Sequence, residues 1–222
     1  SCFGGSDGNI YVDVNGGIPA YSYSWTNSAN SVGVSQNLLN ITSETYSVVV
    51  TDENNCMTTN SVVISQPLAP LSLTYTKEDV LCNGFNTGSV DLTVVGGTPG
   101  YTYNWSNTSN LEDVMNLFAG NYSVTVQDIN GCAESEFLEI FEPLAPLSIS
   151  SIINDVLCFG DSTGSVNLTT TGGTQPYTYS WINSQFSMST ITEDLINFPA
   201  ENYILTTTDA NNCVLNDTFK IN

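Results

Sequence analysis

Apolar side chains recur at every second position along most of the chain. Residues 10–14 read Ile-Tyr-Val-Asp-Val and residues 90–94 read Val-Asp-Leu-Thr-Val. Residues 101–105 and 122–126, which are Tyr-Thr-Tyr-Asn-Trp and Tyr-Ser-Val-Thr-Val, follow the same rule. A period of two is typical of β-strands with one buried face and one solvated face. No segment shows a convincing helical period, so the sequence predicts an all-β fold.

The alternating segments are arranged in three similar copies. Each copy contains, in order, Cys-x-Gly, an alternating run, Gly-Gly, Tyr-x-Tyr-x-Trp, a second Tyr-initiated run that ends in Asp, and a second Cys. The first cysteines are Cys2, Cys82 and Cys158, so the period is 80 and then 76 residues, and the second cysteines are Cys56, Cys132 and Cys213. Such a period indicates a repeat protein. Most of the length variation lies between the Trp and the later Tyr, where we expect a surface connection.

Two near-identical linkers separate the copies. Residues 66–71 read Gln-Pro-Leu-Ala-Pro-Leu, and residues 142–147 read Glu-Pro-Leu-Ala-Pro-Leu. Two prolines in four residues stiffen a joint and exclude it from the interior of a sheet. We therefore predict three domains: a first repeat at 1–66, a second at 67–142 and a third at 143–222.

An additional strand is predicted after each linker, at 71–75 and 147–152. The first repeat lacks this strand, so we expect the sequence to be a piece of a longer array. With the additional strand, each repeat has seven short strands (A, B, C, a short C′, E, F and G), as in an immunoglobulin-like β-sandwich. The predicted fold is three tandem immunoglobulin-like β-sandwich repeats in an elongated array. Its predicted core residues are the Trp of strand C and the Tyr that opens strand F: Trp25, Trp105, Trp181, Tyr46, Tyr122 and Tyr203.

The charge balance excludes several classes of partner. The chain has 22 acidic residues, two lysines and no histidine, which gives a net charge of −20. Nucleic acids and anionic membranes attract clustered Lys and Arg, so neither is expected to bind. Because histidine is the commonest general base, its absence argues against an enzyme, and no cofactor is expected.

Cysteine usage and hydropathy indicate the compartment. Six cysteines without a Cys-x-x-Cys pair favour disulfides in an oxidising environment. No run of about 18 apolar residues is present, so membrane insertion is not expected. We expect an extracellular protein.

The turn before each second cysteine is a candidate metal site. Asp-x-Asn there resembles the opening of a calcium loop, in which oxygen ligands alternate along the chain. The distal bidentate Glu of such a loop is missing, and the segment stands where a hairpin turn is needed, so we favour a plain turn in which Asp caps the backbone. The weak metal candidates are Asp52, Asn54, Asp128, Asn130, Asp209 and Asn211.

Two further groups of side chains resemble binding or catalytic sites. The Tyr-x-Tyr-x-Trp triplets could stack on sugars, but their spacing places all three rings on one strand face, which favours core packing. Glu112-Asp113 aligns with Glu193-Asp194, and glycosidases use two acids about 5 to 10 Å apart. Gln36-Asn37 occupies this place in the first repeat. We therefore interpret the acidic pairs as a solvated edge.

The combined motif resembles a known family. Residues 82–90, 96–106 and 119–132 carry Cys-Asn-Gly-Phe-Asn-Thr-Gly-Ser-Val, Gly-Gly-Thr-Pro-Gly-Tyr-Thr-Tyr-Asn-Trp-Ser and Ala-Gly-Asn-Tyr-Ser-Val-Thr-Val-Gln-Asp-Ile-Asn-Gly-Cys. They are similar to the SprB repeat, which occurs in tandem in the giant cell-surface adhesin of gliding Bacteroidota. The third copy departs from the pattern at Gln175-Pro176 and Asn211-Asn212. The resemblance implies an extracellular, outer-membrane-associated filament that the type IX secretion system exports and that moves along the cell surface during gliding.

Two cysteine pairings remain open. In a seven-strand repeat the first Cys precedes strand B at one end, and the second Cys lies in the F–G turn at the other end. Because disulfide Cα atoms lie within about 7 Å, this favours bonds between neighbouring repeats: Cys2 with Cys132 and Cys82 with Cys213. A six-strand repeat would reverse the parity and favour bonds within repeats: Cys2 with Cys56, Cys82 with Cys132 and Cys158 with Cys213.

These observations favour a structural stalk segment of a bacterial cell-surface adhesin filament, in gliding motility or surface adhesion. The alternative is an extracellular β-sandwich module that binds calcium or carbohydrate. The expected partners are neighbouring repeats of the same chain. Surface polysaccharide or another substratum would be contacted through parts outside these residues.

Overall fold

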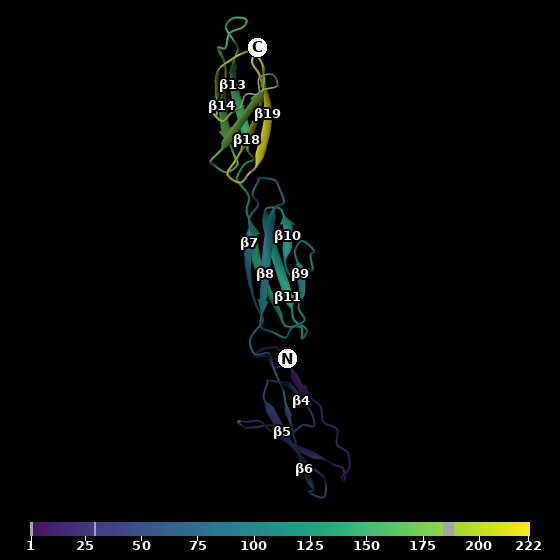
Figure 1. Ribbon diagram of the computed structural model, residues 1–222. Coiled ribbons are helices and arrows are strands. Elements are labelled where there is room, and N and C mark those ends of the chain that lie inside the picture. Colours follow the sequence, from purple (N-terminus) through teal and green to yellow (C-terminus); the bar gives the residue numbers. More distant parts are fainter. Residues whose placement is uncertain (1, 29, 184–188) are drawn as a thin grey trace. The chain divides into compact units, whose positions relative to one another are not determined.

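The computed structural model describes residues 2–28, 30–183 and 189–222. Within these ranges it has strands β1 to β19 and no helix, which confirms the all-β prediction (Figure 1). The described residues therefore include no helix that is long and apolar enough to cross a membrane. The strands form three successive sets that follow the three copies of the sequence motif.

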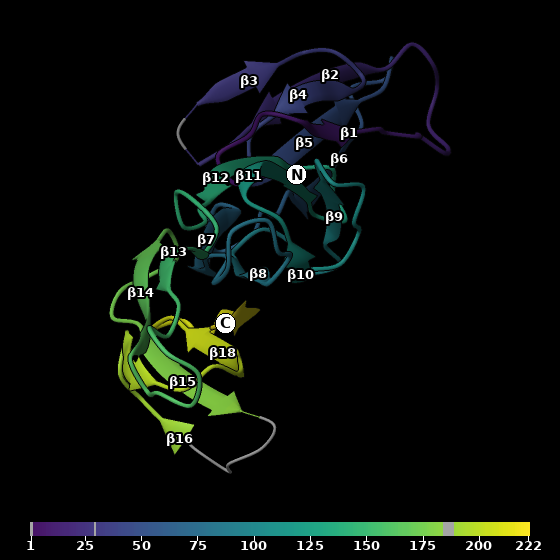
Figure 2. The same cartoon turned by 90° about the horizontal axis from the view of Figure 1, so that it is seen from above.

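The third repeat has the complete set of strands. One of its sheets has the order β13-β14-β17, and the other has the order β16-β15-β18-β19, with all pairings antiparallel (Figures 1 and 2). These strands correspond to A-B-E and C′-C-F-G of an immunoglobulin-like sandwich. Their bounds are β13 Ser148–Asn154, β14 Gly164–Thr171, β15 Thr178–Asn183, β16 Ser189–Thr190, β17 Leu195–Phe198, β18 Asn202–Thr208 and β19 Val214–Lys220.

The second repeat has the same two sheets without strand C′. Its sheets have the orders β10-β8-β7 and β12-β11-β9. The bounds are β7 Ser72–Glu78, β8 Gly88–Val95, β9 Thr102–Trp105, β10 Val114–Leu117, β11 Gly120–Gln127 and β12 Ala133–Ile140. The prediction of seven strands is wrong for this copy. The connection after Trp105 is shorter than in the other repeats, and it turns at once, with the Thr108 N–H donating to the Trp105 carbonyl at 2.9 Å.

The first repeat has a less regular first sheet. Strands β1 and β4 form a two-stranded sheet, and the other sheet has the order β3-β2-β5-β6. Their bounds are β1 Gly8–Ile10, β2 Ser22–Thr26, β3 Ser31–Gly33, β4 Leu38–Ile41, β5 Thr45–Thr51 and β6 Met57–Val63. Residues 11–15, which the alternation predicts to continue the strand, belong to no strand.

The chain divides into two compact units. The first unit consists of Ser1–Tyr75, Leu92–Glu112 and Ser123–Phe137. Its first repeat has a core of Ile10, Trp25, Leu38, Tyr46, Val48 and Val50. The second unit consists of Thr76–Asp91, Asp113–Tyr122 and Leu138–Asn222. Its third repeat has a core of Val166, Leu168, Trp181, Leu195, Tyr203, Leu205, Phe219 and Ile221.

Candidate functional site: the disulfide-bridged joints

The three tryptophans are fixed inside the sandwiches. Trp25, Trp105 and Trp181 are at most 2% exposed. Each indole N–H donates to a backbone carbonyl of the connection that follows strand C, at Ser35 (2.8 Å), Leu111 (2.9 Å) and Thr192 (3.0 Å). A buried indole needs such a partner. The tryptophans therefore hold the variable connection against the core.

The tyrosines that open strand F form a recurring corner. The hydroxyl groups of Tyr46, Tyr122 and Tyr203 donate to the carbonyl four residues upstream, at 3.1, 3.0 and 2.9 Å. This is the tyrosine corner of immunoglobulin-like sandwiches. Tyr46 and Tyr203 are buried, whereas Tyr122 is only half-buried.

The first tyrosine of each Tyr-x-Tyr-x-Trp triplet closes the Gly-Gly turn. The hydroxyl groups of Tyr21, Tyr101 and Tyr177 donate to the carbonyls of Gly16, Gly96 and Gly172 at 2.7, 2.6 and 2.6 Å. The third ring of each triplet is the buried tryptophan, and the first two are half-buried. The triplets thus serve strand packing and turn closure.

The Asp of each Asp-x-Asn segment organises the F–G turn. One carboxylate oxygen of Asp128 accepts the N–H groups of Asn130 and Cys132, both at 2.9 Å, and the other accepts the Thr98 N–H at 2.9 Å. Asp52 and Asp209 make the same three bonds in their own repeats. Each carboxylate therefore ties the F–G turn to the loop after Gly-Gly.

These bonds change the acidity of the carboxyl groups. Hydrogen bonds, foremost from the Cys56 N–H, lower the pKa of Asp52 below its ordinary value. Burial raises the pKa of Asp128, but the N–H groups of Thr98, Cys132 and Asn130 outweigh it, so the net pKa is lowered. Both oxygens of these carboxylates already accept backbone donors, which is what a capped turn requires. The described residues include no group of three or more His, Cys, Asp or Glu side chains that could hold a metal ion.

The acidic pairs also have a structural use. Asp194 accepts the Leu168 N–H at 2.8 Å, and Asn37 accepts the Val12 N–H at 3.0 Å at the matching place in the first repeat. Glu193 accepts the hydroxyl proton of Tyr179 at 2.9 Å. Asp194 is half-buried and Glu193 is exposed. Beyond its place at this edge, the Asp194 side chain supplies a partner to the Leu168 donor, which an irregular connection leaves without a strand partner.

A disulfide joins cysteines of neighbouring repeats in each unit. In the first unit Cys2 is bonded to Cys132, with Sγ atoms 1.99 Å and Cα atoms 5.7 Å apart. In the second unit Cys82 is bonded to Cys213, with distances of 1.97 and 5.7 Å. Cys56 and Cys158 are exposed and form no disulfide within the described residues.

The third repeat shows why its own two cysteines do not pair. Cys158 lies in the loop between β13 and β14, where the Val156 N–H donates to the Asn222 carbonyl. Cys213 lies in the turn between β18 and β19, which Asp209 ties to Thr174 beyond the other end of β14. The eight residues of β14 separate these ends. They span about 26 Å, far beyond the limit of about 7 Å for the Cα atoms of a disulfide.

The turn that carries Cys213 also contacts the second repeat without a covalent bond. The Asn211 side-chain amide donates to the Leu81 carbonyl at 2.9 Å and to the Thr174 hydroxyl at 3.0 Å. Asn211 was considered above only as a weak metal candidate. In the structure its amide links the F–G turn to the residue that precedes Cys82.

Each linker is held at both ends by glycine loops. Ahead of the second repeat, the Gly4 N–H donates to the Gln66 side chain at 2.7 Å, and the Gly97 N–H donates to the Ala69 carbonyl at 3.0 Å. Ahead of the third repeat, the N–H groups of Gly84 and Gly173 make the matching bonds to Glu142 (2.5 Å) and Ala145 (2.9 Å). The Cys-x-Gly loop of one repeat and the Gly-Gly turn of the next therefore both donate hydrogen bonds to the same linker.

The first glycine of Gly-Gly is required by this close approach. Gly96 and Gly172 have φ angles of +72° and +70°, and a Cβ on either would collide with the carbonyl of the second linker proline, Pro70 or Pro146. The Gly-Gly pattern predicted only a turn, so this contact was not predicted. The sequence did contain a signal for this contact, because the linker, the Cys-x-Gly loop and the Gly-Gly turn recur together.

Comparison with known proteins gives one family. The SprB repeat model matches residues 1–30, 74–110 and 150–186. No curated protein matches the chain.

Three solved structures illustrate more distant likenesses. Three N-terminal domains of the Hoc protein of bacteriophage RB49 are 12% identical, with 95% of this chain and 90% of that chain covered and a TM-score of 0.43. The N-terminal eight Ig domains of the Down syndrome cell adhesion molecule are 10% identical, with 90% and 32% covered and a TM-score of 0.41. The amphioxus IgVJ-C2 molecule is 11% identical, with 61% and 97% covered and a TM-score of 0.28.

The three segments that match the family contain one part of the joints, whereas the linkers and the second cysteines lie outside them. Each contains one Cys-x-Gly loop, one Gly-Gly turn and one Tyr-x-Tyr-x-Trp strand. Each of the three copies is therefore similar to the SprB repeat over one segment.

Proposed function

We propose that this chain is a structural stalk segment of an extracellular bacterial adhesin filament, in which successive repeats are stapled to one another to carry tension. The observation that supports it most directly is the Cys82–Cys213 disulfide, which links the loop before strand B of one repeat to the F–G turn of the next. We propose residues 1–66, 67–142 and 143–222 as the repeats of this segment. Similarity to the SprB repeat in all three copies favours a cell-surface adhesin that serves gliding motility or attachment.

The disulfides shorten the covalent path along the chain. Cys2 and Cys213 are 211 residues apart in sequence. Through both disulfides, the shortest path contains only the 50 residues between Cys82 and Cys132. Fully extended, the first path is at most about 740 Å and the second about 180 Å. A repeat that unfolds under load would therefore release little length, which is useful for a filament that must transmit force.

Single-molecule stretching tests this directly. The handles are attached at Ser1 and Val214. At full unfolding, the oxidised chain should extend to about 180 Å and the reduced chain to about 740 Å. A Cys56→Ser/Cys158→Ser variant is the matched control, since neither thiol forms a disulfide within the described residues. Equal contour lengths before and after reduction would contradict the stapled stalk.

Solution scattering tests the stalk shape separately. Each sandwich should be about 30 to 40 Å long, so three in line would span roughly 100 Å and give a radius of gyration of about 30 Å. A compact globule of this length would give about 17 Å. A value near the compact one would overturn the proposal of a stalk.

A further inference from the structure

In the second repeat, both disulfides are attached next to the central strands of the sheets. Cys82 lies in the loop that precedes β8, and the sheet order β10-β8-β7 places β8 between two neighbours. Cys132 lies in the turn that follows β11, and the order β12-β11-β9 places β11 between two neighbours. A short segment therefore connects each disulfide to a strand that has a hydrogen-bonded partner on both sides.

The linkers lead to edge strands of the same repeat. The linker at 66–71 runs directly into β7, and β12 runs into the linker at 142–147. Both strands stand at the end of their sheet order, so among the described strands each has a partner on one side only. Without disulfides, tension along the chain would therefore act on two edge strands, whose outer backbone groups are unpaired with any strand.

The third repeat shows how much more firmly a central strand is held. Its edge strand β19 pairs with β18 over seven residues. The central strand β18 has that ladder and a second ladder with β15, which extends over six residues. Removal of β18 from its sheet requires both ladders to break, whereas β19 separates when one is lost.

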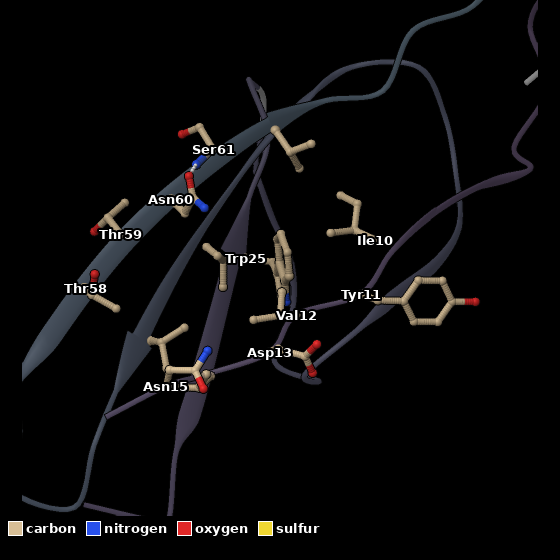
Figure 3. Close-up of a pocket in the computed structure, with 14 residues that line it drawn as sticks. Ile10, Tyr11, Val12, Asp13, Asn15, Trp25, Thr58, Thr59, Asn60 and Ser61 are labelled. Carbon is tan, nitrogen blue, oxygen red and sulfur yellow. Dashed lines mark hydrogen bonds between the residues drawn. The ribbon is translucent and has the colours of Figure 1, made fainter. Parts of the chain in front are cut away.

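Edge strands are also less buried than central strands. All seven residues of β7 are exposed or half-buried, whereas Gly88, Val90 and Leu92 of β8 are buried. In the first repeat all seven residues of the edge strand β6 are exposed. Figure 3 shows the Thr58 to Ser61 segment of β6 to one side of the buried Trp25. Separation of an edge strand therefore exposes less apolar surface to water.

Hydrogen bonds close the segments that connect the cysteines to the central strands. The loop before β8 is closed by the Leu81 N–H, which donates to the Thr87 hydroxyl at 3.0 Å. The turn after β11 is closed by Asp128, whose carboxylate accepts the Cys132 N–H at 2.9 Å. Little slack separates each disulfide from its strand, so tension on the bond reaches the strand directly.

We propose that the two disulfides transfer tension from the edge strands of the second repeat to its central strands. Tension enters at β8 and leaves at β11, while β7, β12 and both linkers carry little of it. The residues from Cys82 to Cys132 contain β8, β9, β10 and β11 but neither linker. This inference rests on the proposed stalk function and adds which strands of the stalk resist the pull.

Two pulling geometries on the same oxidised chain test this inference. Handles at Ser1 and Val214 act on the second repeat through its disulfides. Handles at Leu68 and Leu144 act on it through β7 and β12, and both leucines are 103% exposed, so a handle there displaces no packed group. At equal force, the second repeat should unfold at least about tenfold more slowly in the first geometry, because a second ladder of backbone hydrogen bonds must break.

Equal unfolding rates in the two geometries, or faster unfolding through the disulfides, would overturn the inference. The extended length with handles at Ser1 and Val214 separates this failure from failure of the stalk proposal. A length of about 180 Å with equal rates would leave the stapled stalk standing and reject only the choice of strands. A length of about 740 Å in the oxidised chain would overturn both.

A cut linker gives an independent readout. A protease recognition sequence inserted between Leu144 and Ala145 allows the linker to be cut after the disulfides have formed, and the uncut insertion variant is the matched control. With handles at Ser1 and Val214, the cut oxidised chain should unfold at the same rate as the uncut one. Near-ultraviolet circular dichroism checks that the repeats stay folded after the cut. Unfolding that is at least about tenfold faster in a folded, cut chain would show that the linker carries tension and would overturn the inference.

Discussion

Thr207 is a polar residue at a core position that the other repeats give to valine. Val50 and Val126 are its counterparts, and all three side chains are buried. The Thr207 hydroxyl is fully buried, and it has no hydrogen-bond partner among the described residues. A buried hydroxyl without a partner loses its hydration and gains nothing in return.

Replacement of this hydroxyl should therefore stabilise the third repeat. We expect Thr207→Val to raise its free energy of unfolding by about 1 kcal/mol. Denaturant unfolding followed by the fluorescence of Trp181 measures the change. Thr206→Val is the adjacent control, because the Thr206 hydroxyl donates to Asn216 at 2.8 Å. A gain in the control as large as that in Thr207→Val would point to β-propensity instead of the buried hydroxyl.

Asp128 should make stability depend on pH in the acid range. Its folded pKa lies below the ordinary value of 3.8, because the N–H groups that it accepts outweigh the effect of burial. The unfolded chain therefore binds the proton more readily, and the stabilisation is present above the ordinary pKa and is lost as pH falls through the folded pKa.

The variant Asp128→Asn tests this carboxylate. Its amide nitrogen cannot accept the Thr98 N–H, so we expect a loss of about 2 kcal/mol in the free energy of unfolding at neutral pH. Urea unfolding at a series of pH values should show the difference from the natural chain shrinking below pH 4. A difference that stays constant down to pH 2 would show that the charge of Asp128 has no part in it.

At the scale of elements, the joint depends on glycines that belong to one repeat and contact the linker before it. Gly96 approaches the Pro70 carbonyl, while Gly97 donates to the Ala69 carbonyl in the same unit. The tyrosine that follows, Tyr101, closes the same turn from the other side. A linker of two prolines is stiff, and these contacts fix where it lies.

Gly96→Ala should therefore lower the free energy of unfolding by more than the cost of placing an alanine at a positive φ. Its φ of +72° and the collision with Pro70 act together, so we expect a loss of at least about 2 kcal/mol in the free energy of unfolding. Gly84→Ala is the control, with a φ of +79° and no atom within 4 Å of the added Cβ, and it should lose about 1 kcal/mol. Denaturant unfolding measures both changes. Similar losses of unfolding free energy in the two variants would mean that the Pro70 carbonyl moves aside at no cost.

At the scale of the whole molecule, the stalk and the calcium-binding module differ in whether the fold needs a divalent ion. If the Asp-x-Asn turns held calcium, a saturating ion at 100 times its dissociation constant would stabilise the chain by about 2.7 kcal/mol. The hydrogen bonds on Asp52, Asp128 and Asp209 instead favour turns that need no ion. We expect excess chelator to shift the melting temperature by less than about 2 °C, whereas loss of such an ion would lower it by several degrees. A clear fall on chelation would promote the calcium-binding alternative.

The repeats and most of their strands could be predicted from the sequence alone, because both follow from local signals. Alternation of apolar residues places Val166 and Leu168 on one strand face, and the Trp and Tyr positions recur in every copy. The strand directions expected for seven strands also favoured disulfides between repeats. The pairing stayed open at that point, because the local pattern does not determine whether the short strand C′ forms. The second repeat keeps the pairing between repeats although it lacks C′, because β10 still runs antiparallel to β8.

How the copies are joined follows only from the three-dimensional structure. The contacts of Gly96 with Pro70 and of Asn211 with Leu81 link residues far apart in sequence, and no periodic pattern encodes such a distance. The same holds for Asp194, which belongs to an acidic pair that the sequence suggested to be a solvated edge. The exposure of Val12 and Val62, which is greater than that of their counterparts Leu168 and Phe219, also follows from the three-dimensional structure, because burial depends on which strand lies next to a residue.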